Sequence, residues 1–432
     1  MKQLIKKVTP RFMLSGYYFT LAFLGAMFYG FPSKETIVIG VSGTNGKSTV
    51  VNLIERILSE AGHKTGLIST YNIKIAGKEE YNKTKLTMPG RFFLQKKIRE
   101  ATKAGCKFVV VETSSEGILQ SRHRFIHFDI AVFTNLTPEH IERHGSFENY
   151  KNAKLKLFQY LEKLSYKYID GKKIKKLIVA NGDDKHSDEF VNFNVDKKLR
   201  FSLAKNAEMV ASNIQTNSEG SNFLVSEIQF KIALLGQKNI SNCLAAISVA
   251  NSLGVSLEVC SKSLSKVKGI PGRMEWIDEG QNFRVMIDYA PEPYSMKFLY
   301  ETVKIFEKNK IIHVFGSAGG GRDKSRRPVL GKLVGESADI AIVTNEDPYD
   351  ESPQEIIDQV AKGVEQVGKK EGENLFKILD RKEAIKKALS LAKEKDLVLI
   401  TGKGSEQYMV VGNGKKIPWD DRVVVREEIK KI

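Results

Sequence analysis

The feature that most constrains the fold is a glycine-rich loop placed between a strand pattern and a helix pattern. Residues 36–41 (TIVIGV) form a short apolar run, and apolar residues recur at helical spacing over 47–61. Between them lies the loop Gly43-Thr44-Asn45-Gly46-Lys47-Ser48-Thr49. Its glycines let backbone N–H groups curve around phosphate oxygens, at the positive end of the helix dipole. Lys47 can reach the β- and γ-phosphates and Ser48 can ligate Mg²⁺. Although Val41 stands where the general phosphate-loop pattern has glycine, the pattern predicts nucleotide binding.

Strand and helix patterns alternate along the rest of the chain, as expected for parallel sheets covered by helices. Buried-strand patterns occur at 107–112, 129–134, 177–181, 284–288, 311–315, 340–344 and 397–401. The segment 269–272 (GIPG) interrupts both periods and is a plausible hinge. We therefore expect an α/β chain: a P-loop-type central domain with a mostly parallel sheet at 35–271, then a Rossmann-like α/β domain at 272–432.

The N-terminal segment 1–34 contains an uncharged apolar stretch at 12–31, which is long enough to span a bilayer. Lys2, Lys6, Lys7 and Arg11 precede it, so the positive-inside tendency would hold the N-terminus in the cytoplasm. A spanning helix would then place the nucleotide loop outside the cell, where there is no ATP. We therefore favour a helix that docks on the protein or lies in the membrane interface over a true span.

Charge and cysteine content narrow the function classes. The formal net charge is +17, but the lysines are spread along the chain without interleaved aromatic side chains, so no nucleic-acid partner is expected. Three scattered cysteines indicate neither a disulfide framework nor a thiolate zinc site. The sequence favours a cytoplasmic protein, with possible membrane association through 12–31, whose positive field attracts anionic substrates.

Many ordered motifs, from about Lys34 to the C-terminus, resemble those of the Mur ligase family. They are the GTNGKST loop, 112–115 (ETSS), 133–140 (FTNLTPEH), 148–150 (ENY), 153–154 (AK), 239–242 (NISN), 272–275 (GRME), 288–290 (DYA), 322–324 (RDK) and 402–404 (GKG). Within the family, these segments most resemble the ligases that add the third amino acid of the peptidoglycan stem peptide.

The resemblance implies an ATP-dependent ligase that activates a carboxylate as an acyl phosphate, which the amine of an amino acid then attacks. It implies that Lys47, Glu112, His140 and Lys154 are catalytic, with Ser48, Glu112, His140 and Lys154 around Mg²⁺. The family's lysine at position 154 is carbamylated, which requires a neutral amine and hence a depressed pKa. From the residues alone, Glu112 would more often be a strand-end carboxylate, His140 a surface or capping histidine, and Lys154 a solvated helix lysine.

The resemblance also nominates residues for each substrate. For ATP they are Asn242, Arg273 and Asp288, beside the loop Gly43, Thr44, Asn45, Gly46, Lys47, Ser48 and Thr49. For the acceptor, a UDP-muramoyl dipeptide, they are Thr87, Pro89, Ser114 and Arg122. For the free amino acid they are Arg322, Glu346, Asp347, Tyr349, Gly402 and Glu406.

Three departures from the family pattern bear on specificity. Residues 1–34 are too short for the family's first domain, which holds the UDP group, so a lipid-linked acceptor is conceivable. Tyr349 stands where diaminopimelate-adding members have Arg, which favours L-lysine or another diamino acid near Glu346 and Asp347. Pro291 and Ser405 replace two histidines of the family. A folylpolyglutamate synthase-like ligase, or a non-catalytic scaffold that keeps the ligase fold, would also be compatible with the sequence.

Overall fold

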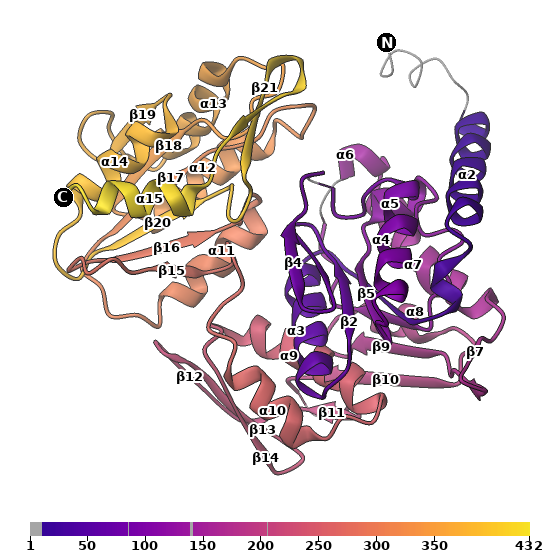
Figure 1. The fold of residues 1–432 in the computed structure, drawn as a ribbon. Helices are drawn as coiled ribbons and strands as arrows, with labels where there is room; N and C mark the ends of the chain where they lie inside the picture. Colours follow the sequence, from indigo (N-terminus) through magenta and orange to yellow (C-terminus); the bar gives the residue numbers. More distant parts are fainter. Residues whose placement is uncertain (1–10, 85, 139–140, 205) are drawn as a thin grey trace. The chain divides into compact units, whose positions relative to one another are not determined.

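The computed structural model describes residues 11–84, 86–138, 141–204 and 206–432. Residue contacts divide the chain into two compact units, one of Met1–Thr216 with Gly220–Val267 and the other of Asn217–Glu219 with Lys268–Ile432. The division falls beside the expected hinge, and Figure 1 shows the elements of each unit.

The first unit is built on a nine-stranded sheet with the order β11-β10-β9-β6-β1-β5-β2-β3-β4. Strands β1, β2, β5, β6, β9, β10 and β11 pair in parallel, whereas β3 and β4 add an antiparallel edge. The strands are β1 (Ile37–Ser42), β2 (Thr65–Ile68), β3 (Asn72–Ile75), β4 (Lys78–Tyr81), β5 (Phe108–Glu112), β6 (Ile130–Phe133), β9 (Leu177–Asn181), β10 (Lys197–Ser202) and β11 (Met209–Val210).

Helices cover both faces of this sheet because its central strands are apolar on both sides. Val109 and Val111 of β5 face a core shared with four helices, whereas the alternate residue Val110 points to the other face. The four helices are α4 (Arg91–Lys103), α5 (Ser115–Leu119), α7 (Phe147–Lys163) and α8 (Ser187–Val191). On the other face lie α3 (Lys47–Glu60), α9 (Gln237–Ser252) and α10 (Leu257–Ser265), which contact one another.

Smaller elements complete the first unit. A three-stranded sheet packs on α10, and a short hairpin and a four-residue helix lie outside the main sheet. These elements are β12 (Ser212–Asn217), β13 (Gly220–Val225), β14 (Ile228–Ile232), β7 (Tyr168–Ile169), β8 (Lys172–Lys173) and α6 (Ile141–His144).

The expected apolar helix is present as α2 (Arg11–Phe28), which is followed by a one-turn 3₁₀ helix, Pro32–Lys34. It packs along α4 through small side chains, with Ala22 and Ala26 buried. Gly25 lies so close to α4 that a Cβ there would be 3.4 Å from the Cα of Phe92. Among the described residues, no helix combines the length and apolarity that crossing a bilayer requires.

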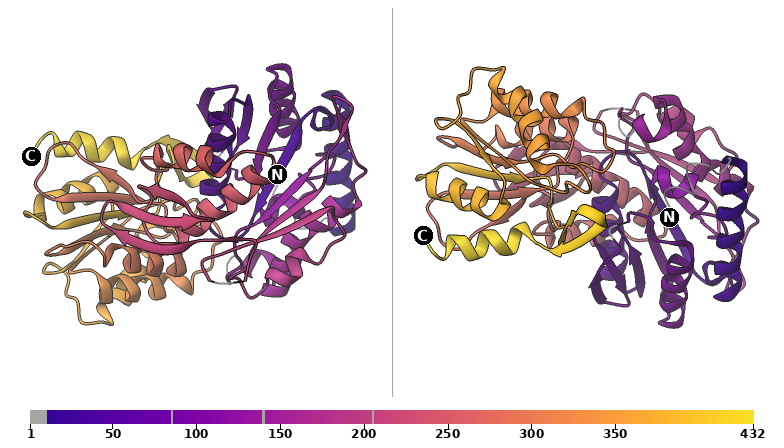
Figure 2. Two further views of the ribbon diagram at one scale, coloured as in Figure 1. Left: turned by 90° about the horizontal axis from the view of Figure 1, so that it is seen from below. Right: turned by 90° about the horizontal axis from the view of Figure 1, so that it is seen from above.

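The second unit contains a six-stranded sheet with the order β15-β16-β20-β17-β18-β19, parallel except for β15. Helices α14 and α15 share a core with one face of the sheet, and α11, α12 and α13 lie on the other face (Figure 2). The elements are β15 (Glu275–Ile277), β16 (Arg284–Asp288), α11 (Pro293–Val303), β17 (Ile311–Phe315), α12 (Arg326–Ser337), β18 (Ile340–Thr344), α13 (Pro353–Glu365), β19 (Leu375–Ile378), α14 (Arg381–Leu391), β20 (Leu397–Thr401), the hairpin β21 (Tyr408–Val411) and β22 (Lys415–Pro418), and α15 (Asp421–Ile429). Two α/β units with mainly parallel sheets confirm the expected fold class.

Candidate active site

The loop between β1 and α3 is held against the segment that follows β6. The backbone N–H of Thr44 donates to the carbonyl of Asn135 (2.8 Å), and that of Asn45 donates to the Asn135 side-chain oxygen (2.9 Å). A Cβ at Gly43 would lie 1.9 Å from the Thr134 hydroxyl, and one at Gly46 would lie 2.3 Å from the Asn242 side-chain oxygen. Gly46 also has φ +82°, so both positions require glycine.

The start of α3 fits a phosphate group. Gly46 is the N-cap residue and provides no side-chain hydrogen bond, so the first N–H groups of the helix keep the orphan character of an uncapped terminus. Lys47 donates from Nζ to the carbonyl of Thr44 (2.8 Å), which places its ammonium over the loop. Asn242 of α9, nominated for ATP, lies against Gly46 and therefore at this phosphate-binding end of the site.

Ser48 and Glu112 are brought together as the sequence predicts. Glu112 ends β5 next to Val41 of β1, at the carboxyl edge of the sheet. The Ser48 hydroxyl lies 3.0 Å from each carboxylate oxygen of Glu112, and the N–H of Thr70 donates to Oε2 at 2.8 Å. Both side chains are buried. Hydroxyl and carboxylate oxygens are ligands that suit Mg²⁺, so this pair fits a nucleotide-bound metal.

The two remaining predicted metal ligands are His140 and Lys154. His140 lies outside the described residues. Among the residues that are described, no group of three or more His, Cys, Asp and Glu side chains could hold a metal ion. The predicted set combines the Ser48 hydroxyl and Lys154 with Glu112 and His140, so it is not a group of that kind, and it stays a prediction.

Lys154 lies under the phosphate loop. Its side chain is only 2% exposed, and its Nζ donates to the carbonyl of Gly43 (2.6 Å) and stands 4.4 Å from the centre of the Tyr150 ring. The Tyr150 hydroxyl in turn lies 3.1 Å from the Thr44 hydroxyl. Lys151, by contrast, forms ion pairs with Glu148 and Glu189. The structure thus separates Lys154 from its lysine neighbours, which the sequence pattern could not do.

The residues nominated for the acceptor also converge. Arg122 follows α5 and donates from Nη1 to the carbonyl of Met88, beside Thr87 and Pro89. Ser114 caps α5 by accepting a hydrogen bond from the N–H of Gly117 (3.1 Å). A Cβ at Gly117 would meet the Met88 sulfur at 2.7 Å, so the segment 87–89 packs directly on the start of α5.

In the second unit, Lys403 organises residues nominated for the amino acid. Its buried ammonium donates to Asp347 Oδ1 (2.8 Å) and Glu406 Oε2 (2.6 Å), and these carboxylates raise its pKa against the opposing effect of burial. Asp347 also accepts the N–H of Val410 (2.7 Å). Lys403 thus binds one oxygen of each carboxylate, and the role of Asp347 and Glu406 in binding the free amino acid stays a prediction. Sequence reasoning missed Lys403, although it stands between two nominated residues.

Glu346 and Arg322 occupy a neighbouring position. Glu346 Oε2 is buried and has no hydrogen-bond partner in the described part of the chain, and a Cβ at Gly402 would lie 2.4 Å from it. Burial raises the pKa of Glu346, opposed by Arg381 and Lys403. Burial lowers the pKa of Arg322, but nearby Tyr289, Tyr349 and Glu346 raise it overall, so its positive charge is secure.

Asp288 and Arg273, nominated for ATP, also lie close together. The two carboxylate oxygens of Asp288 accept the N–H groups of Met274 and Ala290, each at 2.8 Å. Burial raises the pKa of Asp288, and Arg273 opposes this. The guanidinium of Arg273 stacks 4.4 Å from the centre of the Tyr289 ring. Asp288 thus fixes the turn that carries Arg273.

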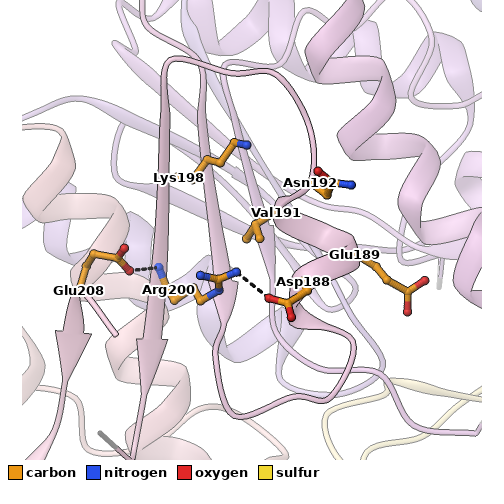
Figure 3. Close-up of a pocket in the computed structure, with 7 residues that line it drawn as sticks. All are labelled: Asp188, Glu189, Val191, Asn192, Lys198, Arg200 and Glu208. Carbon is orange, nitrogen blue, oxygen red and sulfur yellow. Dashed lines mark hydrogen bonds and ion pairs between the residues drawn. The ribbon is translucent and has the colours of Figure 1, made fainter. Parts of the chain in front are cut away.

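A surface pocket of about 490 Å³ lies elsewhere in the first unit, between α8 and β10 (Figure 3). Two interactions link its lining residues: the Arg200 guanidinium pairs with Asp188 at 2.7 Å, and the backbone N–H of Arg200 donates to Glu208 at 2.7 Å. None of the predicted site residues within the described part of the chain lines it, so we do not assign the active site to this pocket.

Comparisons with known proteins agree with this arrangement. Residues 41–250 match the Mur ligase middle domain, and residues 272–404 match the Mur ligase glutamate ligase domain. The UDP-N-acetylmuramoyl-L-alanyl-D-glutamate–2,6-diaminopimelate ligase of Halalkalibacterium halodurans is 37% identical over 414 residues, which cover 95% of this chain and 82% of the relative. The UDP-N-acetylmuramyl-tripeptide synthetase of Roseiflexus sp. is 36% identical over 420 residues, covering 95% and 82%.

Solved structures of ligases are also similar to this chain. A UDP-N-acetylmuramoyl-L-alanyl-D-glutamate–2,6-diaminopimelate ligase aligns with a TM-score of 0.61 at 31% identity, covering 92% of this chain and 78% of the other. The folylpolyglutamate synthase of Mycobacterium tuberculosis aligns with a TM-score of 0.69 at 17% identity, covering 89% and 92%, which shows only a shared fold. The chain belongs to the Mur ligase family. It is therefore an ATP-dependent ligase that forms amide bonds.

Proposed function

We propose that this enzyme joins an amino acid to UDP-N-acetylmuramoyl-L-alanyl-D-glutamate in peptidoglycan precursor synthesis. The observation that carries the proposal is the convergence of Ser48, Glu112 and Lys154 on one phosphate loop. The Halalkalibacterium halodurans relative, which matches over most of its length, is named for ligation to this acceptor, and the Roseiflexus relative is named a muramyl-tripeptide synthetase. Folylpolyglutamate synthase is disfavoured, because its likeness is one of fold alone.

The proposed reaction brings two anions together, ATP and the carboxylate of the acceptor. The acceptor carboxylate attacks the γ-phosphorus of ATP, the bond to the bridging oxygen breaks, and ADP leaves. The amine then attacks the resulting acyl phosphate, losing a proton, and inorganic phosphate leaves as the amide forms. Loop N–H groups and Lys47 would hold the phosphates and offset the developing charge. Mg²⁺ bound by Ser48 and Glu112 would supply further positive charge and orient the transferred group.

We propose L-lysine or another diamino acid as the amino acid. Arg322 presents a stable positive charge for the substrate α-carboxylate. Tyr349 lacks the guanidinium fork that a second, distal carboxylate would need. Among the described residues, Oε2 of Glu346 is buried without a hydrogen-bond partner, and we assign it to accept the substrate ammonium.

Turnover of the purified protein tests this function. With ATP and Mg²⁺, phosphate release should require both the muramoyl dipeptide and an amino acid, and mass spectrometry should show the tripeptide product. We expect a higher kcat/KM with L-lysine than with diaminopimelate. The function would be refuted if phosphate were released at the same rate without the muramoyl dipeptide, or if no amino acid supported phosphate release. A preference for diaminopimelate would refute only the amino-acid assignment.

We further propose that α2 contacts an anionic membrane surface from the cytoplasm. Its outward side chains Met13, Tyr17, Leu24, Met27 and Phe28 are exposed, Phe28 by 74%, and four basic residues precede the apolar stretch. The full chain should float with vesicles containing anionic lipid, and the double variant Met27→Asp, Phe28→Asp should float less. If neither the full chain nor the double variant floated with the vesicles, or if both floated equally, the proposed contact would be excluded.

A further inference from the structure

Two guanidinium groups meet beside the acceptor residues of the first unit. Arg91 is the first residue of α4 and Arg122 follows α5, and both donate to Gln120. Arg91 Nη2 donates to the Gln120 carbonyl, and Arg122 Nη2 donates to its side-chain oxygen (2.8 Å). Arg122 Nη1 also bonds the carbonyl of Met88, in the segment nominated for the acceptor. The sequence nominates Arg122 for the acceptor, whereas nothing in its pattern points to Arg91.

The charge of this pair is not balanced locally. Among the described residues, no carboxylate forms an ion pair with Arg91 or Arg122, and the Nε atom of each is buried without a hydrogen-bond partner. Glu116, the carboxylate that acts on Arg122, instead pairs with Arg143 at 2.6 Å. Burial, and then the charge of Arg122, lower the pKa of Arg91, yet a guanidinium stays charged at neutral pH. Two like charges held together in a partly buried place favour an anion between them.

The N-terminal helix forms one wall of this place. The Tyr18 ring centre lies 4.4 Å from Arg91 Cζ, so the phenol stacks on the guanidinium. The position of α2 is fixed further along by Gly25 against α4, and by Arg99, which donates to the carbonyls of Tyr29 (2.8 Å) and Gly30 (3.0 Å). Tyr18 is thus held over Arg91 rather than presented on a free terminus.

We propose that Arg91 and Arg122 together bind one oxyanion of the acceptor, with Tyr18 as the wall that orients Arg91. This inference rests on the proposed function and adds Arg91 and Tyr18 as specificity-determining residues. Paired guanidinium forks match the oxygens of a carboxylate or a phosphate. The oxyanion is either a carboxylate of the acceptor peptide or a phosphate of its carrier, and the experiment separates these sources.

Steady-state kinetics of the full chain provide the first test. Arg91→Gln should raise the KM for UDP-N-acetylmuramoyl-L-alanyl-D-glutamate about tenfold, the loss expected for one charge-assisted contact, with kcat and the KM for ATP unchanged. Arg91→Lys should have an intermediate effect, and Tyr18→Leu should raise the KM about threefold. Lys96→Gln is the matched control, since Lys96 is an exposed cation of the same helix whose partner is Glu100.

The acceptor without its carrier identifies the source. If the effect of Arg91→Gln disappears with N-acetylmuramoyl-L-alanyl-D-glutamate, the pair binds a carrier phosphate; if it persists, the pair binds a peptide carboxylate. An unchanged KM for both acceptors in a folded Arg91→Gln variant would overturn the proposal.

A binding measurement separates this inference from the ligase function itself. In a Lys47→Ala background, which weakens the phosphate loop, calorimetry with inorganic phosphate should still detect a site that Arg91→Gln weakens about tenfold. This result does not need turnover. If Arg91→Gln leaves phosphate binding unchanged in the Lys47→Ala background, Arg91 and Arg122 do not form an oxyanion site, even if the enzyme is an active ligase.

Discussion

Replacing Gly46 by alanine tests how tightly the phosphate loop is built. Gly46 has φ +82°, and an added Cβ would lie 2.3 Å from the side-chain oxygen of Asn242. Alanine in the left-handed region costs about 1–2 kcal/mol, and forcing Asn242 aside adds about 1–3 kcal/mol. We therefore expect Gly46→Ala to lower the free energy of unfolding of the first unit by about 2–5 kcal/mol and to raise the KM for ATP.

Gly62→Ala is the matched control, because Gly62 has φ +85° and no described residue places an atom within 4 Å of an added Cβ. It should lower the free energy of unfolding by only about 1–2 kcal/mol and leave the KM for ATP unchanged. The double variant Gly46→Ala, Asn242→Ala should recover part of the lost free energy of unfolding, because the added methyl group no longer meets the Asn242 side chain. The two substitutions together should therefore cost less than the sum of their separate effects.

Urea denaturation followed by far-UV circular dichroism measures these changes. Trp276 and Trp419, the two tryptophans, lie in the second unit, so their fluorescence provides an internal reference that should not shift. If Gly46→Ala destabilised the first unit no more than Gly62→Ala does, the close packing of the loop on Asn242 would be refuted.

Three further outcomes follow from the second unit. Lys403→Met should lower its free energy of unfolding by about 3–5 kcal/mol, because Asp347 and Glu406 lose their shared buried cation; an unchanged midpoint of the tryptophan fluorescence transition would contradict this. His313, held between the Tyr300 hydroxyl (2.5 Å) and the Thr401 hydroxyl (3.0 Å), has its pKa lowered to about 3 by burial. Since the unfolded chain protonates near 6.5, stability is complete above that pH and falls as pH drops toward 3, by about 2 kcal/mol between pH 7 and 5; His313→Asn should flatten this part of the pH profile. Tyr349→Arg should raise kcat/KM for diaminopimelate relative to L-lysine about tenfold, measured in competition, and an unchanged ratio would exclude Tyr349 from specificity.

Much of the sheet could be predicted because parallel strands buried on both faces are continuous apolar runs. The segments 177–181 and 311–315 coincide with β9 and β17. Strands β4 and β12 were missed for the converse reason: both are mainly polar, with mostly exposed side chains, and resemble loops in sequence.

The site was predictable only where its residues lie in recognisable motifs. The phosphate loop follows from its place between a strand and a helix, whereas the metal role of Glu112 follows only from the family motif in which it ends a strand. Lys154 could not be distinguished from Lys151, since burial under the loop depends on packing from a distant segment. Lys403 likewise acquires its role from Asp347, 56 residues away in the chain, and no local pattern encodes that pairing.

An isotope experiment tests the central claim that ATP activates the acceptor carboxylate. The muramoyl dipeptide is labelled with ¹⁸O in both carboxylates of its glutamate and incubated with the enzyme, ATP, Mg²⁺ and the amino acid. Transfer through an acyl phosphate predicts one ¹⁸O atom in each phosphate released with product. Product formation with unlabelled phosphate would contradict the mechanism assigned to this site.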